Sequence, residues 1–203
     1  RFARPANANS AKLVLRGRNT QWLEYVIGEG LDLLGGSYDS WYESRQTRDF
    51  IPQWYQAQNI PLAVYVKRDG AWQLADRIPA HGPMADRDMV VPLDLRGIHG
   101  DEIEVKLEFG PGFWDIDYAG LDLSPDREFH KTTVRLDKAT DQDGKDVSAT
   151  LLDGDDSYLV QARVGDTAQL SFAAPAAREG WTRSVFLHSQ GHYKILRSSG
   201  GVP

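Results

Sequence analysis

Residues 102–109 alternate without interruption between charged and apolar side chains, and this pattern constrains the fold more than any other feature of the chain. The apolar members are Ile103, Val105, Leu107 and Phe109, with Glu or Lys at every position between them. Successive side chains of a β-strand point to opposite faces of a sheet, so this strand has one buried face and one solvated face. The pattern predicts an antiparallel sheet that packs against a core on one side.

Further strands are expected on both sides of this segment. Leu62–Lys67 and Trp72–Ile78 flank Asp69-Gly70, and Asp-Gly between two apolar runs indicates a hairpin with positive φ at the glycine. Met89–Leu95 and Trp114–Leu123 continue the β pattern along the first half of the chain. Residues 62–123 are therefore expected to be β throughout.

A second group of short strands is expected after the polar, proline-containing boundary at residues 124–126. Turn residues separate its members at spacings typical of a β-sandwich. The expected strands are Thr132–Leu136, Val147–Leu151, Tyr158–Ala162, Ala168–Phe172, Ser184–His188 and Tyr193–Leu196.

We therefore predict an all-β fold with two β-sandwich modules. The chain has 203 residues, 41% of them hydrophobic, which suffices for one large core or two modest ones. Residues 20–124 are expected to form the first, jelly-roll-like sandwich, with a long aromatic insertion at residues 35–60. Residues 125–203 are expected to form a second, smaller sandwich. A single fused sandwich is the alternative.

Residues 1–19 are expected to form a basic extended arm. They carry five basic side chains, and no acid precedes Glu24. Such a segment is either a solvated terminal linker or an arm that lies on an acidic partner or a lipid surface. The arginines predicted to bind a partner are Arg1, Arg4, Arg16 and Arg18.

The next region is rich in aromatic rings. For Trp22–Leu34 we predict a strand followed by irregular structure, because Gly28 and Gly30 argue against a long helix and neither period dominates. Residues 35–60 are expected to be a long functional connection. Its rings either cap the sandwich core or contact a protein or a sugar. The rings predicted to bind a partner are Trp41, Tyr42, Trp54 and Tyr55.

Three segments of the first half, residues 90–96, 100–109 and 113–118, resemble the closing strands of galactose-binding-like jelly-roll domains, in which a tryptophan precedes an apolar–Asp pair. Residues 155–160, 164–166 and 185–193 are similar to C-terminal segments of uncharacterised bacterial exported proteins. The resemblance implies a periplasmic or extracellular location in the bacterial envelope. It also implies binding of sugars or other proteins through loops at one end of the sandwich, with a structural calcium in some members.

Composition excludes several classes of function. The net charge of −6 disfavours nucleic-acid binding, and the absence of cysteine excludes disulfides and thiolate metal sites. No apolar run is long enough to cross a membrane. The chain begins at Arg1 rather than at Met, which leaves an upstream signal peptide, lipid anchor or domain open.

Acidic and histidine clusters supply few candidates for chemistry. Asp141, Asp143 and Asp146 surround a glycine, which predicts an acidic turn and leaves a calcium site as the alternative. The neighbours Asp115 and Asp117 are spaced for a structural role, because two acids on one strand cannot flank a glycosidic bond. The pair His188 and His192 lacks a third ligand nearby for a metal ion.

We therefore expect no catalysis and no cofactor. The function expected is that of an extrinsic structural subunit, which docks on protein subunits of a larger bacterial envelope assembly through its arm and its aromatic insertion. The alternative is a carbohydrate-binding module of an exported protein, and a glycan-active enzyme is the third class considered.

Overall fold

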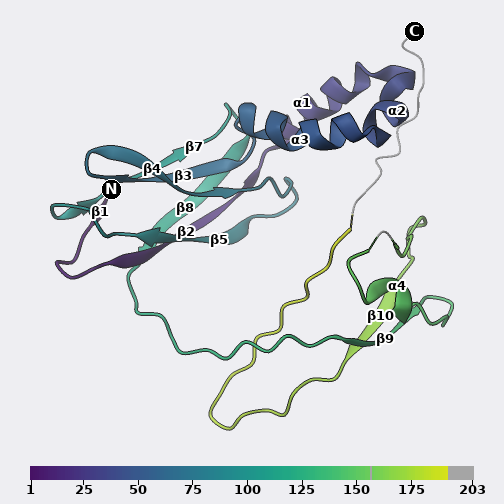
Figure 1. Ribbon diagram of the computed structural model, residues 1–203. Helices are drawn as coiled ribbons and strands as arrows, with labels where there is room; N and C mark the ends of the chain where they lie inside the picture. The colour runs from purple at the N-terminus through teal and green to yellow at the C-terminus, as the bar shows by residue number, and fades with distance from the viewer. Residues whose placement is uncertain (156, 192–203) are drawn as a thin grey trace. The chain divides into compact units, whose positions relative to one another are not determined.

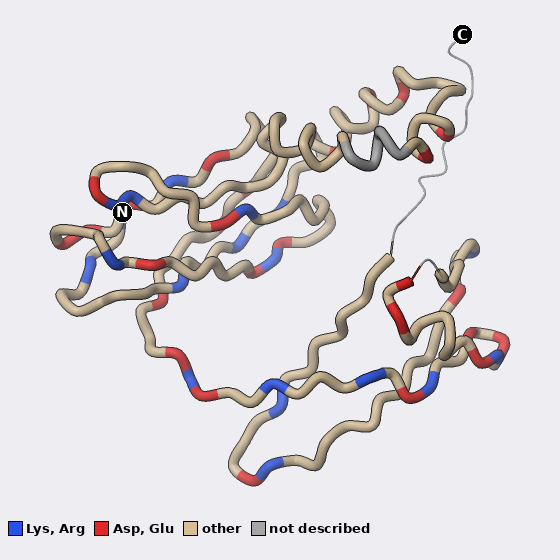
Figure 2. Tube along the Cα trace, viewed as in Figure 1, with Lys and Arg blue, Asp and Glu red and all other residues tan. Residues whose placement is uncertain are grey.

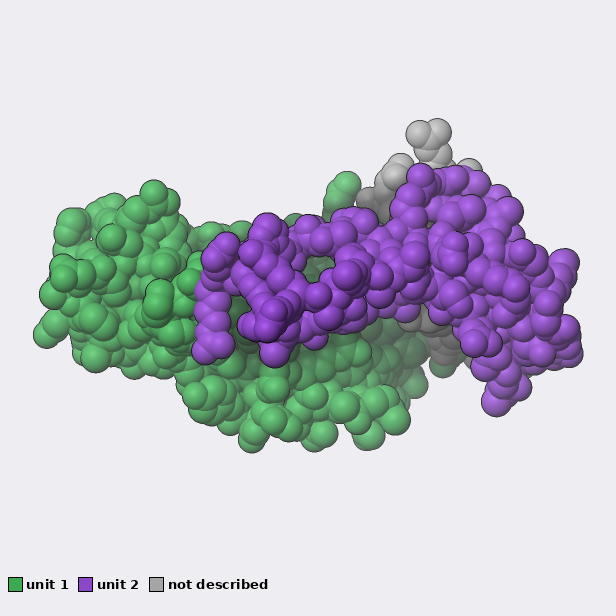
Figure 3. Space-filling model, turned by 90° about the horizontal axis from the view of Figure 1, so that it is seen from below, with its two compact units in different colours: residues 1–126, 198–203 green, residues 127–197 purple. Residues whose placement is uncertain are grey.

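The computed structural model describes residues 1–155 and 157–191, except for the side chains of residues 45–49. The chain is predominantly β and divides into two compact units (Figure 1, Figure 3). Unit 1 contains Arg1–Asp126, and unit 2 contains Arg127–Arg197, of which the structure describes residues up to 191. The division falls two residues after the expected boundary.

The first sheet of unit 1 has β2, Ser10–Asn19, as its central strand. It pairs antiparallel with β5, Arg87–Asp94, on one side and with β8, Trp114–Asp122, on the other. Residues 10–19, which were expected to lie in an extended arm, therefore form a strand with a partner along both edges. Their apolar alternation, with Ala11, Leu13 and Leu15 pointing inward, gives the physical reason.

The second sheet has β3, Leu62–Arg68, at its centre, between β4, Ala71–Ile78, and β7, Val105–Glu108. The predicted hairpin is confirmed: Asp69 and Gly70 link β3 to β4 with φ values of 49° and 77°. Positive φ at both central residues is the type I′ pattern, whose twist matches that of the flanking strands.

A short pair of strands begins the chain. β1, Phe2–Ala3, pairs antiparallel with β6, Glu102–Ile103. The backbone N–H of Arg4 also donates to the carbonyl of Asp101 at 2.7 Å. The first residues of the chain are thus tied to the segment that precedes β7.

The inner faces of the two three-stranded sheets share one hydrophobic cluster, the sandwich core. β2 contributes Leu13 and Leu15, and β3 contributes Leu62, Val64 and Val66, all of them buried. Two antiparallel sheets with one shared core are compatible with a β-sandwich, in which the side chains of two facing sheets interdigitate. The burial of about a dozen apolar side chains accounts for the order of unit 1.

The alternating segment at residues 102–109 follows its prediction in part. Ile103 is fully buried, and Val105, Leu107 and Phe109 are half-buried against the sandwich core. Among the intervening charged side chains, Glu104, Lys106 and Glu108 are half-buried rather than fully exposed, because Glu104 pairs with Lys67 of β3 and Lys106 pairs with Glu108 along β7.

Residues 21–57 form helices, so the predictions of a strand at Trp22 and of a connection without regular structure at residues 35–60 are wrong. The elements are α1, Gln21–Asp32, the 3-10 turn η1, Gly35–Ser37, α2, Tyr38–Glu43, and α3, Arg45–Ala57. The helices lie at one end of the sandwich (Figure 1).

α1 begins where Thr20 caps it. The Thr20 hydroxyl accepts a hydrogen bond from the backbone N–H of Leu23, and Glu24 lies in the first turn, where the helix dipole favours an acid. A Cβ at Gly28 or at Gly30 would meet no atom within 4 Å, so these glycines face open space. Each weakens the helix by roughly 1 kcal/mol without blocking it.

Both ends of the helical excursion are fastened to the same turn of the sandwich. Asn19 is fully buried, and its Nδ2 donates to the carbonyl of Phe113 at 3.3 Å. At the other end, the backbone carbonyl of Ile60 accepts from Nε1 of Trp114 at 2.8 Å. The helical segment, residues 21–57, therefore leaves the two sheets and rejoins them beside the start of β8. These contacts tie its two ends to the sandwich core.

In unit 2, β9, Leu136–Asp141, pairs antiparallel with β10, Ala168–Phe172, and α4 spans Ser148–Leu151. The strand predicted at Ala168–Phe172 is confirmed as β10. The strand predicted at residues 132–136 is displaced, because β9 begins only at Leu136. The strand predicted at residues 147–151 is wrong, because Asp146 accepts from the backbone N–H and the hydroxyl of Ser148 and so starts a helical turn.

The remaining strands predicted for unit 2 do not form in the part of the chain that the structure describes. Residues 158–162 and 184–188 have no regular structure, and residues 193–196 lie outside the described residues. Figure 3 shows an opening between the chain segments of unit 2. A second complete sandwich stays a prediction. No helix within residues 1–155 and 157–191 is long and apolar enough to cross a bilayer.

Candidate binding surface

The arginines predicted to contact a partner are engaged within unit 1. Arg1 forms ion pairs with Glu102 at 3.6 Å and with Glu104 at 3.3 Å. Arg4 donates to the backbone carbonyls of Gly100 and Ala8. Their first role in the structure is thus to hold the N-terminal segment against the residues before β7.

Arg16 and Arg18 lie on the solvent face of β2. Arg16 is 3.8 Å from Asp88, and Arg18 is 3.8 Å from both Asp86 and Asp115. The acids that neutralise the basic segment come from β5, β8 and the loop before β5, which lie far from it in sequence. The sequence therefore showed an excess of positive charge that the fold balances.

The predicted rings lie in helices. Trp41 and Tyr42 belong to α2 and pack on Tyr38, with ring centroids 6.5 and 5.8 Å from that of Tyr38. Trp54 and Tyr55 belong to α3 and contact each other edge to face at 5.5 Å. These rings are half-buried, while Tyr38, which the sequence reasoning did not select, is buried. Much of their surface stabilises the helices rather than facing solvent.

Two exposed rings were missed. Trp22 and Tyr25 of α1 stack at a centroid distance of 5.7 Å and remain 54% and 57% exposed. Val26 follows on the same face, because positions i, i+3 and i+4 of a helix are neighbours. The sequence carries this signal as an apolar triplet at helical spacing, but Gly28 and Gly30 in the same segment argue against a helix.

We call residues 21–57 the aromatic helical layer. It carries eight aromatic side chains, and its exposed members include Phe50 of α3. The pKa of Tyr55 is raised, first by burial and second by the nearby Glu24 carboxylate of α1, which places α1 and α3 side by side.

The aromatic helical layer is acidic. It contains six Asp or Glu residues and two Arg residues, a net charge of −4 out of the −6 of the whole chain. Figure 2 shows acidic positions and no basic ones along α1 and α2. Large apolar side chains therefore lie in an acidic part of the chain.

The structure does not bring the predicted arginines and rings together. Arg1 lies near the end of the sandwich opposite the helices (Figure 1), and Arg16 projects from the outer face of a sheet. A single partner surface made of basic arm and rings, as the sequence suggested, would have to span both ends of unit 1. The rings lie in the helices, where they contact one another in separate groups within α1, α2 and α3.

A second aromatic cluster, also missed, lies on the solvent face of the other sheet. Lys106 of β7 lies 4.2 Å from the centre of the Tyr65 ring and 5.7 Å from that of Trp72. Lys67 and Lys106 donate to Glu104 and Glu108, and these bonds lower the pKa of both carboxyl groups. Lysine ammonium groups therefore lie over these rings, although Trp72 stays exposed over 42% of its surface.

A polar hollow of about 240 Å³ lies beside the β3–β4 turn. Lys67, Asp69, His99 and Glu104 are among its lining residues, and His99 Nε2 is 3.2 Å from Asp69 Oδ1. Lys67 and Glu104 bond to each other at 2.8 Å across it. The Lys67–Glu104 pair and the exposed His99–Asp69 contact thus engage its charged groups with one another.

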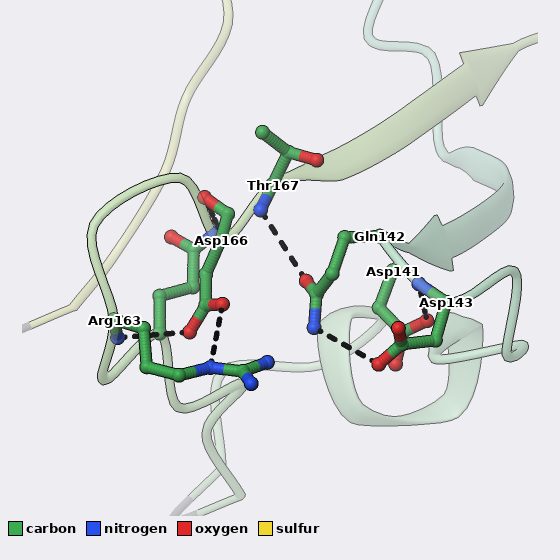
Figure 4. Close-up of polar contacts among 7 residues, drawn as sticks. Asp141, Gln142, Asp143, Arg163, Asp166 and Thr167 are labelled. Atoms are coloured by element: carbon green, nitrogen blue, oxygen red, sulfur yellow. Dashed lines mark hydrogen bonds and ion pairs between the residues drawn. The ribbon is translucent and has the colours of Figure 1, made fainter.

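The loop predicted as an acidic turn or calcium site is held by its own carboxylates (Figure 4). Asp141 Oδ1 accepts from the backbone N–H groups of Asp143 and Lys145 at 3.0 and 2.9 Å. Gln142 links Asp143 to the backbone N–H of Thr167. Among the described residues, no group of three His, Asp or Glu side chains is arranged to hold a metal ion. Calcium at these residues stays a prediction.

Two candidate pairs from the sequence remain, Asp115 with Asp117 and His188 with His192. Asp115 and Asp117 pair with Arg18 and Arg16, at 3.8 and 3.9 Å, rather than facing each other across a cleft. His188 is exposed in an irregular segment, and His192 lies outside the described residues.

Comparisons with protein-family models, with curated proteins and with solved structures each found no match to this chain. The functional argument therefore rests on the geometry above. The arrangement offers exposed rings for binding.

Proposed function

We propose that this chain is a non-catalytic structural subunit that docks on a partner protein through the aromatic helical layer. The observation that carries the proposal is the exposed Trp22–Tyr25–Val26 face of α1. Stacked rings of this size are rarely left in water on a helix whose position is otherwise fixed, and Trp and Tyr dominate the energetics of protein interfaces.

The mode of binding follows from the spacing of these side chains. A helix that presents apolar residues at i, i+3 and i+4 inserts them into a hydrophobic groove of its partner. Because Asn19 and Ile60 fasten the excursion to β8, the helix is held in place before binding, which reduces the entropy lost on association.

The net charge of −4 in the layer supports a partner groove of basic character. Its rim carries Lys or Arg, so association is accelerated at low salt and slowed as salt screens the charges. This replaces the acidic partner expected for the arginines of the N-terminal segment, because those arginines pair within unit 1.

The compartment we propose is the bacterial envelope or the extracellular space. The absence of cysteine supports it, because the chain offers no thiol that an oxidising compartment could modify. A carbohydrate-binding role at Trp41, Tyr42, Trp54 and Tyr55 is less well supported, because Trp41 and Tyr42 pack on Tyr38 and Trp54 packs on Tyr55.

Co-purification of the full chain with its native assembly tests the proposal. Trp22→Ala combined with Tyr25→Ala is expected to weaken association by about 2 kcal/mol, roughly 30-fold, mainly through faster dissociation. The matched control is Trp72→Ala, which removes an exposed ring of similar size from the other face of unit 1. Equal retention of the partner by the double variant and the control would contradict docking through α1.

A further inference from the structure

The outer face of the sheet β5-β2-β8 carries an exposed ring in an unusual position. The phenol end of Tyr118 lies over Gly120 of the same strand, where a Cβ would come 2.7 Å from Cζ and 2.8 Å from Cε1. Gly120 therefore leaves room for the ring against the sheet. Tyr118 is 55% exposed, so the ring surface turned away from Gly120 faces solvent.

The ring continues into an apolar strip that crosses three strands. In the register of the sheet, Val90 of β5, Val14 of β2 and Gly120 of β8 lie side by side. Val90 is also more than half exposed. Neighbouring strands are about 4.8 Å apart, so the strip is roughly 10 Å wide, which is the scale of two linked sugar rings.

A β-bulge borders this strip with polar groups. The register between β2 and β8 shifts after Arg16, so that Asp117 is the extra residue and the neighbours Asp117 and Tyr118 are both exposed. Bulges of this kind redirect side chains and are frequent beside binding sites. Arg16 reaches Asp117 on one side and Asp88 on the other.

The ion pairs of this border are loose. Arg16 and Arg18 lie 3.8 to 3.9 Å from their four carboxylate partners, beyond hydrogen-bond distance. By contrast, Lys12 at the other side of the strip bonds to Asp126 at 2.7 Å, and this contact raises the pKa of Lys12. The guanidinium and carboxylate groups beside Tyr118 thus retain donors and acceptors for a ligand.

We propose that this face binds a neutral saccharide, with a pyranose ring stacked on Tyr118. The C–H groups of a pyranose with equatorial substituents pack on the electron-rich face of an aromatic ring. Its hydroxyl groups donate to the carboxylates and accept from the arginines, and such charge-assisted bonds are stronger than neutral ones. Four carboxylates against two guanidinium groups disfavour an anionic sugar.

The test is titration of the labelled full chain with cellohexaose, followed by nuclear magnetic resonance. Resonances of Tyr118, Val14, Val90 and Arg16 are expected to shift with a dissociation constant of about 0.1 to 10 mM, as befits a shallow site. An oligogalacturonate of equal length is expected to bind at least about fivefold more weakly, because the face is net acidic.

Two variants test the Tyr118 ring and its position over Gly120 separately. Tyr118→Ala and Gly120→Ala are each expected to weaken cellohexaose binding about tenfold, the second because its Cβ displaces the phenol ring. The double variant is expected to match Tyr118→Ala, since no ring remains to be displaced. Backbone amide spectra of each variant confirm that the sheet is intact.

Trp72→Ala and Trp22→Ala serve as controls and are expected to bind cellohexaose like the parent chain, which keeps this test independent of docking through α1. The proposal is overturned if about 10 mM cellohexaose shifts no resonance on this face. It is also overturned if Gly120→Ala binds as well as the parent, or if Trp72→Ala loses as much affinity as Tyr118→Ala.

Discussion

Unit 1 and unit 2 both contain sequence segments with the β pattern, but the two units differ in how much apolar surface covers their sheets. In unit 1, two sheets face each other and bury Leu13, Leu62 and their neighbours in one cluster. Among the described residues of unit 2, Ala139 and Val147 are the buried apolar side chains, and Val160 and Phe186 are largely exposed. The difference shows that alternating sequence produces a stable strand where a second apolar layer faces it.

Unit 2 is held instead by polar contacts between nearby residues. Asp141 and Asp146 accept backbone N–H groups of their own loop, and Asp166 binds the backbone and guanidinium of Arg163. Such contacts order a loop, but each contributes about 1 kcal/mol to stability. We therefore expect cooperative unfolding to report on unit 1.

The largest effect is expected in the sandwich core. Leu62→Ala should reduce the free energy of unfolding by about 2 to 5 kcal/mol, because Leu62 is fully buried between the two sheets. Val147→Ala in unit 2 should leave the same transition within about 0.5 kcal/mol. Urea titration followed by tryptophan fluorescence measures both. Similar losses for the two variants would show that the units unfold together.

A smaller effect is expected at the buried amide of Asn19. Its Oδ1 accepts from the backbone N–H groups of His81 and Gly82 at 2.7 and 3.1 Å, which holds the loop before β5 against β2. Asn19→Ala leaves both donors without this acceptor and should cost about 1 to 3 kcal/mol. The same urea titration applies, and a loss below about 0.5 kcal/mol would mean that water replaces the amide.

The stability of unit 1 is expected to depend on pH through Asp94. Hydrogen bonds from Arg96, assisted by Arg68, hold the pKa of Asp94 far below its usual value. A lowered folded-state pKa stabilises the fold above the unfolded pKa of about 4, and this contribution is lost as pH falls through the folded pKa. The advantage of the parent over Asp94→Asn in urea titrations should shrink from pH 5 to pH 2. A constant difference across that range would contradict the assignment.

The smallest effect is expected in the polar loop of unit 2. Asp141→Asn weakens the acceptor of two backbone N–H groups and should speed hydrogen exchange at Asp143 and Lys145 severalfold. The urea transition of unit 1 should not move. A shift of that transition by about 1 kcal/mol would show that the loop supports the sandwich core.

The parts of the fold that were predictable from sequence are those set by local chemistry. The Asp69-Gly70 turn and its strands were expected because positive φ at two adjacent residues selects one hairpin type. The strand at Ala168–Phe172 was also found. By contrast, the strand expected at residues 184–188 has no layer to pack on within the described residues, and alternation alone did not produce it.

The helices were missed because the local signals disagreed. Gly28 and Gly30 argue against a helix, whereas the Thr20 cap and the Trp22–Tyr25–Val26 spacing favour one. Contacts of Asn19 with Phe113 and of Ile60 with Trp114, which no sequence pattern reveals, hold the two ends of the helical segment. The same disagreement affects the candidate surface. The sequence points to Trp41 and Trp54 of the aromatic helical layer but not to the exposed rings of α1, because that segment is expected to be a strand.

Hydrogen exchange on the full chain, alone and in its co-purified assembly, tests docking through the aromatic helical layer most directly. The account predicts that amides of α1 to α3 exchange at least about tenfold more slowly in the assembly, while those of β3 and β4 are unchanged. Protection confined to β9 and β10, with α1 exchanging as in the free chain, would contradict it and would place the partner on unit 2.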